Sequence, residues 1–129
     1  GRGRCRVKEQ ECAAVRVPAQ PKYILPIRLF LAGLAVRLDF PAETIEDIKM
    51  AAAEACSILL AGAAEDGVLL CTAHEAADHT LEIRLSIEGR QFPSIADEVS
   101  RAMLEAMADA CSLNYREGVC QSISIRFWN

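Results

Sequence analysis

The chain has 129 residues, of which 52% are hydrophobic and 25% are charged, and its formal net charge at pH 7 is −4. This composition is typical of a folded globular protein, and the length fits one domain with a sizeable core. The net negative charge argues against direct binding of nucleic acid. Because Arg28 interrupts the longest apolar region, at 23–36, we expect no membrane-spanning segment.

Six cysteines are spread along the chain, and none forms a C-x-x-C pair. Their density is below that of a disulfide scaffold. Cys56, Cys71 and Cys111 lie in apolar segments, where a reduced cysteine behaves as a small hydrophobic residue. We therefore expect a cytoplasmic protein with free thiols, with disulfides or a metal site as the alternatives.

The first ten residues have no hydrophobic periodicity and carry four basic side chains, Arg2, Arg4, Arg6 and Lys8. We expect residues 1–10 to form a disordered basic arm, with contact to an acidic partner as the alternative. Residues 11–129 contain no linker long enough to divide the chain, so we expect them to form a single domain.

The first predicted elements are a short strand that ends at Pro18 and a helix at 21–39. Two apolar stripes at helical spacing run along this helix, which is more apolar surface than one packing contact needs. We expect the helix to be sandwiched inside the domain; the alternative is that one stripe serves a subunit or partner contact. The stripes are Ile24, Ile27, Leu31, Leu34 and Leu38, and Leu25, Leu29, Ala32 and Val36.

A second helix is predicted at 41–62, with Pro41 at its first position and Gly62 at its end. Its buried stripe consists of Ile45, Ile48, Ala52, Ala55 and Leu59. Asp47 and Glu54 lie on the border of that stripe, and Glu54 is a lone carboxylate among alanines. Such an acid usually has a functional role or a partner.

Alternating apolar residues predict a hairpin with strands at about 67–74 and 79–88. A third helix is predicted at 94–112, because Ser94 followed three residues later by Asp97 is a capping signature. Its predicted apolar face is Ile95, Val99, Met103, Leu104 and Met107.

A closing hairpin is predicted around Glu117 and Gly118. The element order is therefore strand, helix, helix, two strands, helix, two strands. Hairpins with helices between them favour an α+β fold, an α/β two-layer sandwich with the helices on one face of a mostly antiparallel sheet.

Three motifs within residues 15–56 point to a family: the V-P-A end of the first strand, the R-x-x-L-x-G-x-A pattern of the first helix, and I-E-D-I-K-M-A-A-A-E-A-C in the second. In the first helix the pattern falls on Arg28, Leu31, Gly33 and Ala35. This stretch resembles the anti-sigma-factor serine kinases of bacterial partner switching. They belong to the histidine-kinase-like ATPases, the GHKL group with the Bergerat fold.

The resemblance implies a histidine-kinase-like ATPase domain over residues 11–129, with three helices packed on one face of a mixed, mostly antiparallel sheet. Members of this family typically dimerise. They hold a sigma factor inactive, bind an anti-anti-sigma protein, and phosphorylate a serine on it with Mg-ATP. These properties are expectations from the family and do not follow from composition.

The family's nucleotide site maps onto three places in this chain. Its catalytic acid, which polarises the attacking group, corresponds to Glu54, and the asparagine that ligates Mg²⁺ falls on Ile58. The family's Asp-x-Gly falls on Ile87, Glu88 and Gly89. An alkyl side chain cannot coordinate Mg²⁺, and Ile87 offers no acceptor to the adenine amino group. The site is therefore expected to be degenerate.

The phosphate-binding part of the family site is also altered. The family has a glycine-rich lid before its third helix, whereas the connection at 89–95 contains no Gly-x-Gly. Asp97 and Glu98 at the helix start would repel a triphosphate. We expect no cofactor, with ATP and Mg²⁺ as the alternative. Glu54 is then a catalytic remnant or a border carboxylate hydrogen-bonded to a neighbouring group.

His74 and His79 flank a predicted turn and could hold a metal together with Glu75 and Asp78. Their spacing matches no metal-binding motif, so we expect exposed turn histidines and no metal site.

These observations predict a partner-switching regulator of the anti-sigma type that binds protein through a degenerate ATPase fold. The expected partner is a sigma factor or an anti-anti-sigma protein, and a homodimer is expected. Contact is predicted along the spare stripe of the first helix, including Arg28, and along the border of the second helix around Asp47 and Glu54. The acidic start of that helix, with Glu43 and Asp47, could meet a basic patch on the partner, although a solvated helix start also explains these acids. The alternatives are an active ATP-dependent serine-protein kinase and a structural dimerisation module.

Overall fold

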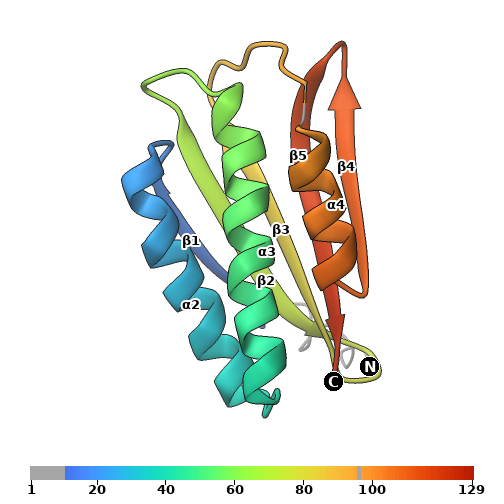
Figure 1. Cartoon of the computed structure of the whole chain (residues 1–129). Coiled ribbons are helices and arrows are strands. Elements are labelled where there is room, and N and C mark those ends of the chain that lie inside the picture. Colours follow the sequence, from blue (N-terminus) through green and yellow to red (C-terminus); the bar gives the residue numbers. More distant parts are fainter. Residues whose placement is uncertain (1–10, 96) are drawn as a thin grey trace, which may run out of the picture.

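Helices and strands form two layers in the computed structural model, which describes residues 11–95 and 97–129 (Figure 1). The predicted basic arm at 1–10 lies outside these residues. The order of the described elements is the one that the sequence predicts, and the α+β class is confirmed. No helix in the described part of the chain is long and apolar enough to cross a membrane.

The sheet has five described strands in the order β1-β2-β3-β5-β4, and every neighbouring pair is antiparallel. The expectation of a mixed sheet was therefore wrong for this part of the chain. Both hairpins join sequential strands, which forces antiparallel pairing. The strands are β1 (Ala13–Pro18), β2 (Val68–Ala76), β3 (Thr80–Glu88), β4 (Ala110–Arg116) and β5 (Val119–Trp128).

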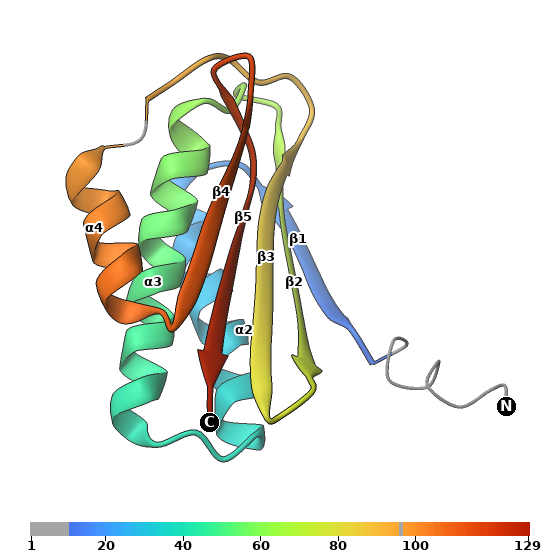
Figure 2. The ribbon, with the colours of Figure 1, turned by 90° about the vertical axis from the view of Figure 1, so that its right-hand side faces the viewer.

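Three α-helices cover one face of this sheet, and no helix of residues 11–95 and 97–129 lies over the other face (Figure 2). A short 3₁₀ turn, η1 (Pro21–Tyr23), leads into α2 (Ile24–Arg37). The other two helices are α3 (Ala42–Ala61) and α4 (Glu98–Met107). Pro41 is the N-cap of α3 and not its first residue, one position from the predicted start.

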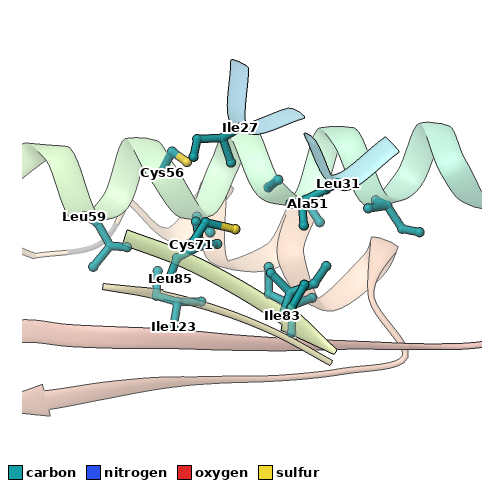
Figure 3. Packing of buried hydrophobic residues seen from close by; sticks show 14 of the residues in the cluster. Ile27, Leu31, Ala51, Cys56, Leu59, Cys71, Ile83, Leu85 and Ile123 are labelled. Carbon is teal, nitrogen blue, oxygen red and sulfur yellow. The ribbon is translucent and has the colours of Figure 1, made fainter. Parts of the chain in front are cut away.

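The core lies between α3 and the inner face of the sheet (Figure 3). Alternate residues of β3 point to this side, from Leu81 to Ile87, and all are buried. Ala51, Ala52 and Ala55 are fully buried on α3, and their small side chains allow the helix to approach the strands closely. Burying a leucine or isoleucine here stabilises the fold by about 1.5–3 kcal/mol each.

The two stripes of α2 have opposite environments. Ile27 and Leu31 are fully buried, whereas Leu25, Leu29 and Val36 are 56%, 58% and 61% exposed. The prediction of a sandwiched helix was therefore wrong. Since α2 lies at the end of the helical layer beside α3, no described element covers its outer side (Figure 1).

The third helix is shorter than predicted at both ends. Its N-cap is Asp97, whose carboxylate accepts from the backbone N–H of Val99 at 3.1 Å, and not Ser94. Ile95 lies outside the helix and is 95% exposed, and Val99 is 63% exposed, so neither belongs to the apolar face. Leu104 is buried and anchors α4 to the core, while β4 begins three residues after the helix ends.

Candidate functional site

Glu54 and Ile58 lie one turn apart on the second half of α3. Glu54 is half-buried, and it makes no hydrogen bond or ion pair with another described residue. The hydrogen-bonded network considered for it is therefore absent from the described part of the chain. Ile58 is only 5% exposed and belongs to the hydrophobic core. The magnesium position of the family thus coincides with a packed alkyl side chain.

Ile87 and Gly89 lie at the end of β3 that faces the second half of α3. Ile87 is 8% exposed and shares the core cluster with Ile58. Gly89 has φ 111°, a backbone conformation that favours glycine. Its position directly after β3 is therefore explained by the backbone turn that ends the strand. The fold therefore brings together the positions that the sequence aligned with the nucleotide site.

The connection between β3 and α4 is hydrogen-bonded over the end of α3. The N–H of Phe92 donates to the carbonyl of Gly62 at 2.7 Å, and the N–H of Ala64 donates to the carbonyl of Arg90 at 3.1 Å. The N–H of Ser94 donates to the carbonyl of Gly118 at 3.0 Å. A Cβ atom at Gly62 would lie 2.6 Å from the carbonyl oxygen of Phe92, so the two backbones are in direct contact.

These features decide whether Mg-ATP fits the positions that the resemblance implies. Glu54 is the one oxygen-bearing side chain among Glu54, Ile58 and Ile87, and it cannot replace both the metal ligand and the adenine acceptor. Neither of the two hollows described for this structure is lined by any of the three. The larger hollow, about 890 Å³, lies by the β2–β3 turn. The residues present therefore do not fit the nucleotide in the family's manner.

The expected partner residue Arg28 lies in the first half of α2. It is half-buried, and its Nε atom is buried without a hydrogen-bond partner in the described part of the chain. Leu25 and Ala32 lie three residues before it and four residues after it, so Arg28 borders the outer stripe, defined here as Leu25, Leu29, Ala32 and Val36. A buried N–H without a partner costs free energy, so the environment of Arg28 is not explained by its contacts within the described part of the chain.

The other expected partner residues are not part of this patch. Glu43 is exposed in the first turn of α3 and Asp47 is half-buried one turn later. Since α2 and α3 run in opposite directions, these acids lie toward the far end of the helix pair from Arg28 (Figure 1). The carboxylates also suit the positive end of the α3 dipole. The structure therefore separates the predicted partner residues into two places.

The two histidines form separate pairs near the β2–β3 turn. His74 Nε2 lies 3.2 Å from Glu82 Oε1, and His79 Nδ1 lies 3.7 Å from Glu75 Oε2. Within the residues that the structure describes, no group of three or more His, Cys, Asp or Glu is arranged to hold a metal ion.

All five described cysteines are free thiols. Cys56 on α3 and Cys71 on β2 are buried in the core, whereas Cys12 is exposed (Figure 3). Burial raises the pKa of Cys56 to about 12 and also raises the pKa of Cys71, with smaller contributions from Cys56 and Cys12. These two thiols therefore act as packing residues and not as nucleophiles.

Arg84 and Arg126, on the uncovered face of the sheet, were not singled out from the sequence. Alternation predicts that Arg84 points away from the core. Its neighbours could not be predicted, because β3 pairs with β5 and not with the next strand along the chain.

Comparison with known proteins finds relatives that share one name. The chain is 32% identical over 87 residues to the serine-protein kinase RsbW of Halalkalibacterium halodurans, which covers 67% of this chain and 54% of the relative. It is 38% identical over 81 residues to RsbW of Listeria innocua, covering 60% and 51%. Over 43 residues it is 49% identical to RsbW of Bacillus subtilis, covering 33% and 27%. No family model matches the chain.

The chain spans about half the length of the first of these relatives. Similarity over that part does not by itself give this chain the activity of the whole relative. The identity to these relatives and the layered fold nevertheless both agree with the resemblance that the motifs at 15–56 indicate. The chain therefore belongs to the family of the RsbW serine-protein kinases.

Proposed function

We propose that the chain is a cytoplasmic partner-switching regulator of the anti-sigma type, which binds protein through α2 and does not use Mg-ATP. The observation that carries the proposal is the exposed outer stripe of α2 beside Arg28. The proposed partner is a sigma factor or an anti-anti-sigma protein that presents apolar side chains and an acidic group to this stripe.

The free energy available from burying the exposed side chains of α2 supports this proposal. Leu29 and Val36 are more than half exposed, although leucine and valine gain free energy when they are buried. Beside them, the half-buried Arg28 forms no ion pair with another described residue, so the solvent-facing part of its guanidinium group would gain a charge-assisted hydrogen bond from a carboxylate of the partner. Arginine is one of the residue types that are enriched in binding hot spots.

Glu43 and Asp47 provide a second, weaker region for the proposed contact. They are acidic and would meet a basic patch on the partner. Neither residue forms an ion pair with another described residue, whereas Glu46 pairs with Lys49 at 3.1 Å. Because exposed charges contribute little energy, we expect them to influence the association rate more than the affinity.

A second copy of the chain is the other proposed occupant of α2, since the resemblance implies a homodimer. Sedimentation of the purified chain measures this directly. A dimer that persists in Leu29→Ser would show that the outer stripe of α2 is not the dimer contact.

Binding to the sigma factors of the source organism tests the main proposal. We expect Arg28→Ala and Leu29→Ser each to weaken binding by about tenfold or more, as hot-spot truncations do. Arg101→Ala, which removes an exposed cation from α4, is the matched control and should leave affinity unchanged. Equal affinities for the Arg28, Leu29 and Arg101 variants would contradict the proposed surface.

The unpaired carboxylate of Glu54 is the observation that favours the alternative, an active serine-protein kinase. Thermal unfolding with and without Mg-ATP separates the two, because a ligand at about 100 times its Kd stabilises the folded state by about 2.7 kcal/mol. We expect no shift. A saturable shift would support the kinase.

A further inference from the structure

The face of the sheet opposite the helices carries a hollow of about 620 Å³. It is lined by residues of β2, β3, β5 and β4, so it extends across the middle of the sheet. None of the described helices lies over this face (Figure 2). The hollow is separated by the whole sheet from Glu54 and Ile58 on α3.

The strand register places one cation between hydroxyl groups in this hollow. Arg84 on β3 lies directly opposite Thr72 on β2 and directly opposite Ser124 on β5. Ser124 in turn lies opposite Ser112 on β4. All four line the hollow, so two hydroxyl groups flank the guanidinium group of Arg84 directly and a third lies one strand further along the same row.

A second guanidinium group lies in the adjacent row. Arg126 is opposite Glu82, which makes it a diagonal neighbour of Arg84. Its Nε lies 2.6 Å from Glu82 Oε2, while the other oxygen of Glu82 lies 3.2 Å from His74 Nε2. One carboxylate therefore serves two basic side chains. Arg84 has no ion pair or hydrogen bond with any other described residue.

We propose that this hollow binds an oxyanion of the phosphate class, held by Arg84, Arg126 and the flanking hydroxyl groups. Glu82 compensates Arg126 but no carboxylate of the described residues compensates Arg84, so an anion bound between the two guanidinium groups adds the negative charge that this pair lacks. Guanidinium groups match the geometry of phosphate oxygens, and hydroxyl groups donate to the oxygens that remain. The chain carries a net charge of −4, so the unneutralised Arg84 is a local feature and not part of a generally basic surface.

The site is independent of the proposed partner binding through α2 and of the family's nucleotide position. Its charged and hydroxyl side chains and its volume suit a small phosphorylated molecule, because ligand sites commonly occupy about 300–1,000 Å³. The same chemistry could come from free phosphate or from a phosphomonoester, and the experiment separates these two sources.

Titration by ¹⁵N–¹H NMR tests the proposal on the full chain at constant ionic strength. Inorganic phosphate and glycerol 3-phosphate are the probes, and sodium chloride is the reference for non-specific screening. We expect saturable shifts at the backbone amides of Thr72, Arg84 and Ser124. Tighter binding of glycerol 3-phosphate would assign the site to phosphomonoesters, and tighter binding of phosphate would assign it to the free anion.

Two substitutions should change the affinity in opposite directions. Arg84→Gln should weaken binding by about tenfold or more, since charge-assisted hydrogen bonds are among the stronger ones. Glu82→Gln should strengthen it, because it releases Arg126 and His74 from their shared carboxylate. Arg101→Gln on α4 makes the same charge change as Arg84→Gln and should have no effect. Linear shifts, or equal losses in the Arg84 and Arg101 variants, would overturn the proposal.

Discussion

The second half of α3 and the outer side of α2 carry similar alkyl side chains in opposite environments. At Ile58 the side chain is 5% exposed and packs in the core, whereas at Leu29 on the neighbouring helix it is 58% exposed. Folding stability explains the first, because a buried isoleucine gains free energy from leaving water. It does not explain the second. The contrast teaches that α3 meets the requirements of the fold, while α2 retains apolar surface that the described chain does not use.

The same contrast applies to polar groups. Glu54 and the Nε of Arg28 both lack partners among the described residues, but the structure around them differs. Glu54 lies beside a closed core, with the β3–α4 connection bonded over the end of its helix. Arg28 lies beside exposed leucines. A macromolecular partner therefore has access to the apolar side chains beside Arg28, as the proposed contact through α2 requires.

The largest expected effect is the difference between the two sides of α2. Leu31→Ala should lower the free energy of unfolding by about 2–5 kcal/mol, because it removes a fully buried side chain and leaves a cavity. Leu29→Ala should change it by less than about 0.5 kcal/mol, as is usual for surface positions. Urea denaturation of the two variants measures both values. Equal losses would mean that the outer stripe is covered in the isolated chain.

Ile58→Asn tests the closed region of α3. We expect a loss of about 2–4 kcal/mol, since the amide replaces a buried alkyl group and finds no partner there. Ser57→Asn, at the exposed neighbouring position, should be close to neutral. We also expect no nucleotide binding by the Ile58 variant in titration calorimetry, because the lid and the adenine acceptor remain absent. Binding of ATP by this variant would show that the remaining pocket is intact.

The buried thiols of the core should make stability fall at high pH. The pKa of Cys56 is raised to about 12 in the folded state from 9.0, so the unfolded chain loses this proton first. The contribution of this thiol to the free energy of unfolding is fully present below pH 9. As pH rises from 9 toward 12, that contribution falls by about 1.4 kcal/mol per pH unit. Urea denaturation between pH 8 and pH 10 should show a smaller slope in Cys56→Ala. Cys12→Ala, at an exposed thiol, should keep the slope of the unchanged protein.

The smallest expected effect concerns the start of α4, which packs beside α3. Asp97→Ala should cost about 1 kcal/mol, the usual value of an N-cap side chain. Ser94→Ala should cost less, because Ser94 contributes its backbone N–H to Gly118 and does not cap the helix. Thermal unfolding of the two variants ranks them. The reverse order would restore Ser94 as the cap.

Local patterns predicted most of the fold. Alternation from Leu81 to Ile87 and the turn at Glu117 and Gly118 depend on near neighbours in sequence, and both hairpins are confirmed. The environment of α2 depends on which element lies on its far side, and no pattern within the helix contains that information. The capping signature at Ser94 failed because the backbone of this segment bonds to Gly62 and Gly118 instead.

The candidate sites divide in the same way. The absence of an oxygen-bearing side chain at Ile58 and Ile87 could be predicted from the sequence, because it depends only on the identity of single residues. The row of Arg84 with its hydroxyl neighbours could not, since it requires the register of β3 against β5, two strands separated along the chain by α4 and β4.

The hydrogen bonds of the β3–α4 connection have a mechanical consequence. Phe92 bonds to the end of α3 and Ser94 bonds to the β4–β5 turn, so these two places cannot move apart unless one of the bonds breaks. A force applied at one end of the segment is transmitted to the other over a few residues. Amide exchange at Phe92 and Ser94 would therefore report on strain that arises far from either residue.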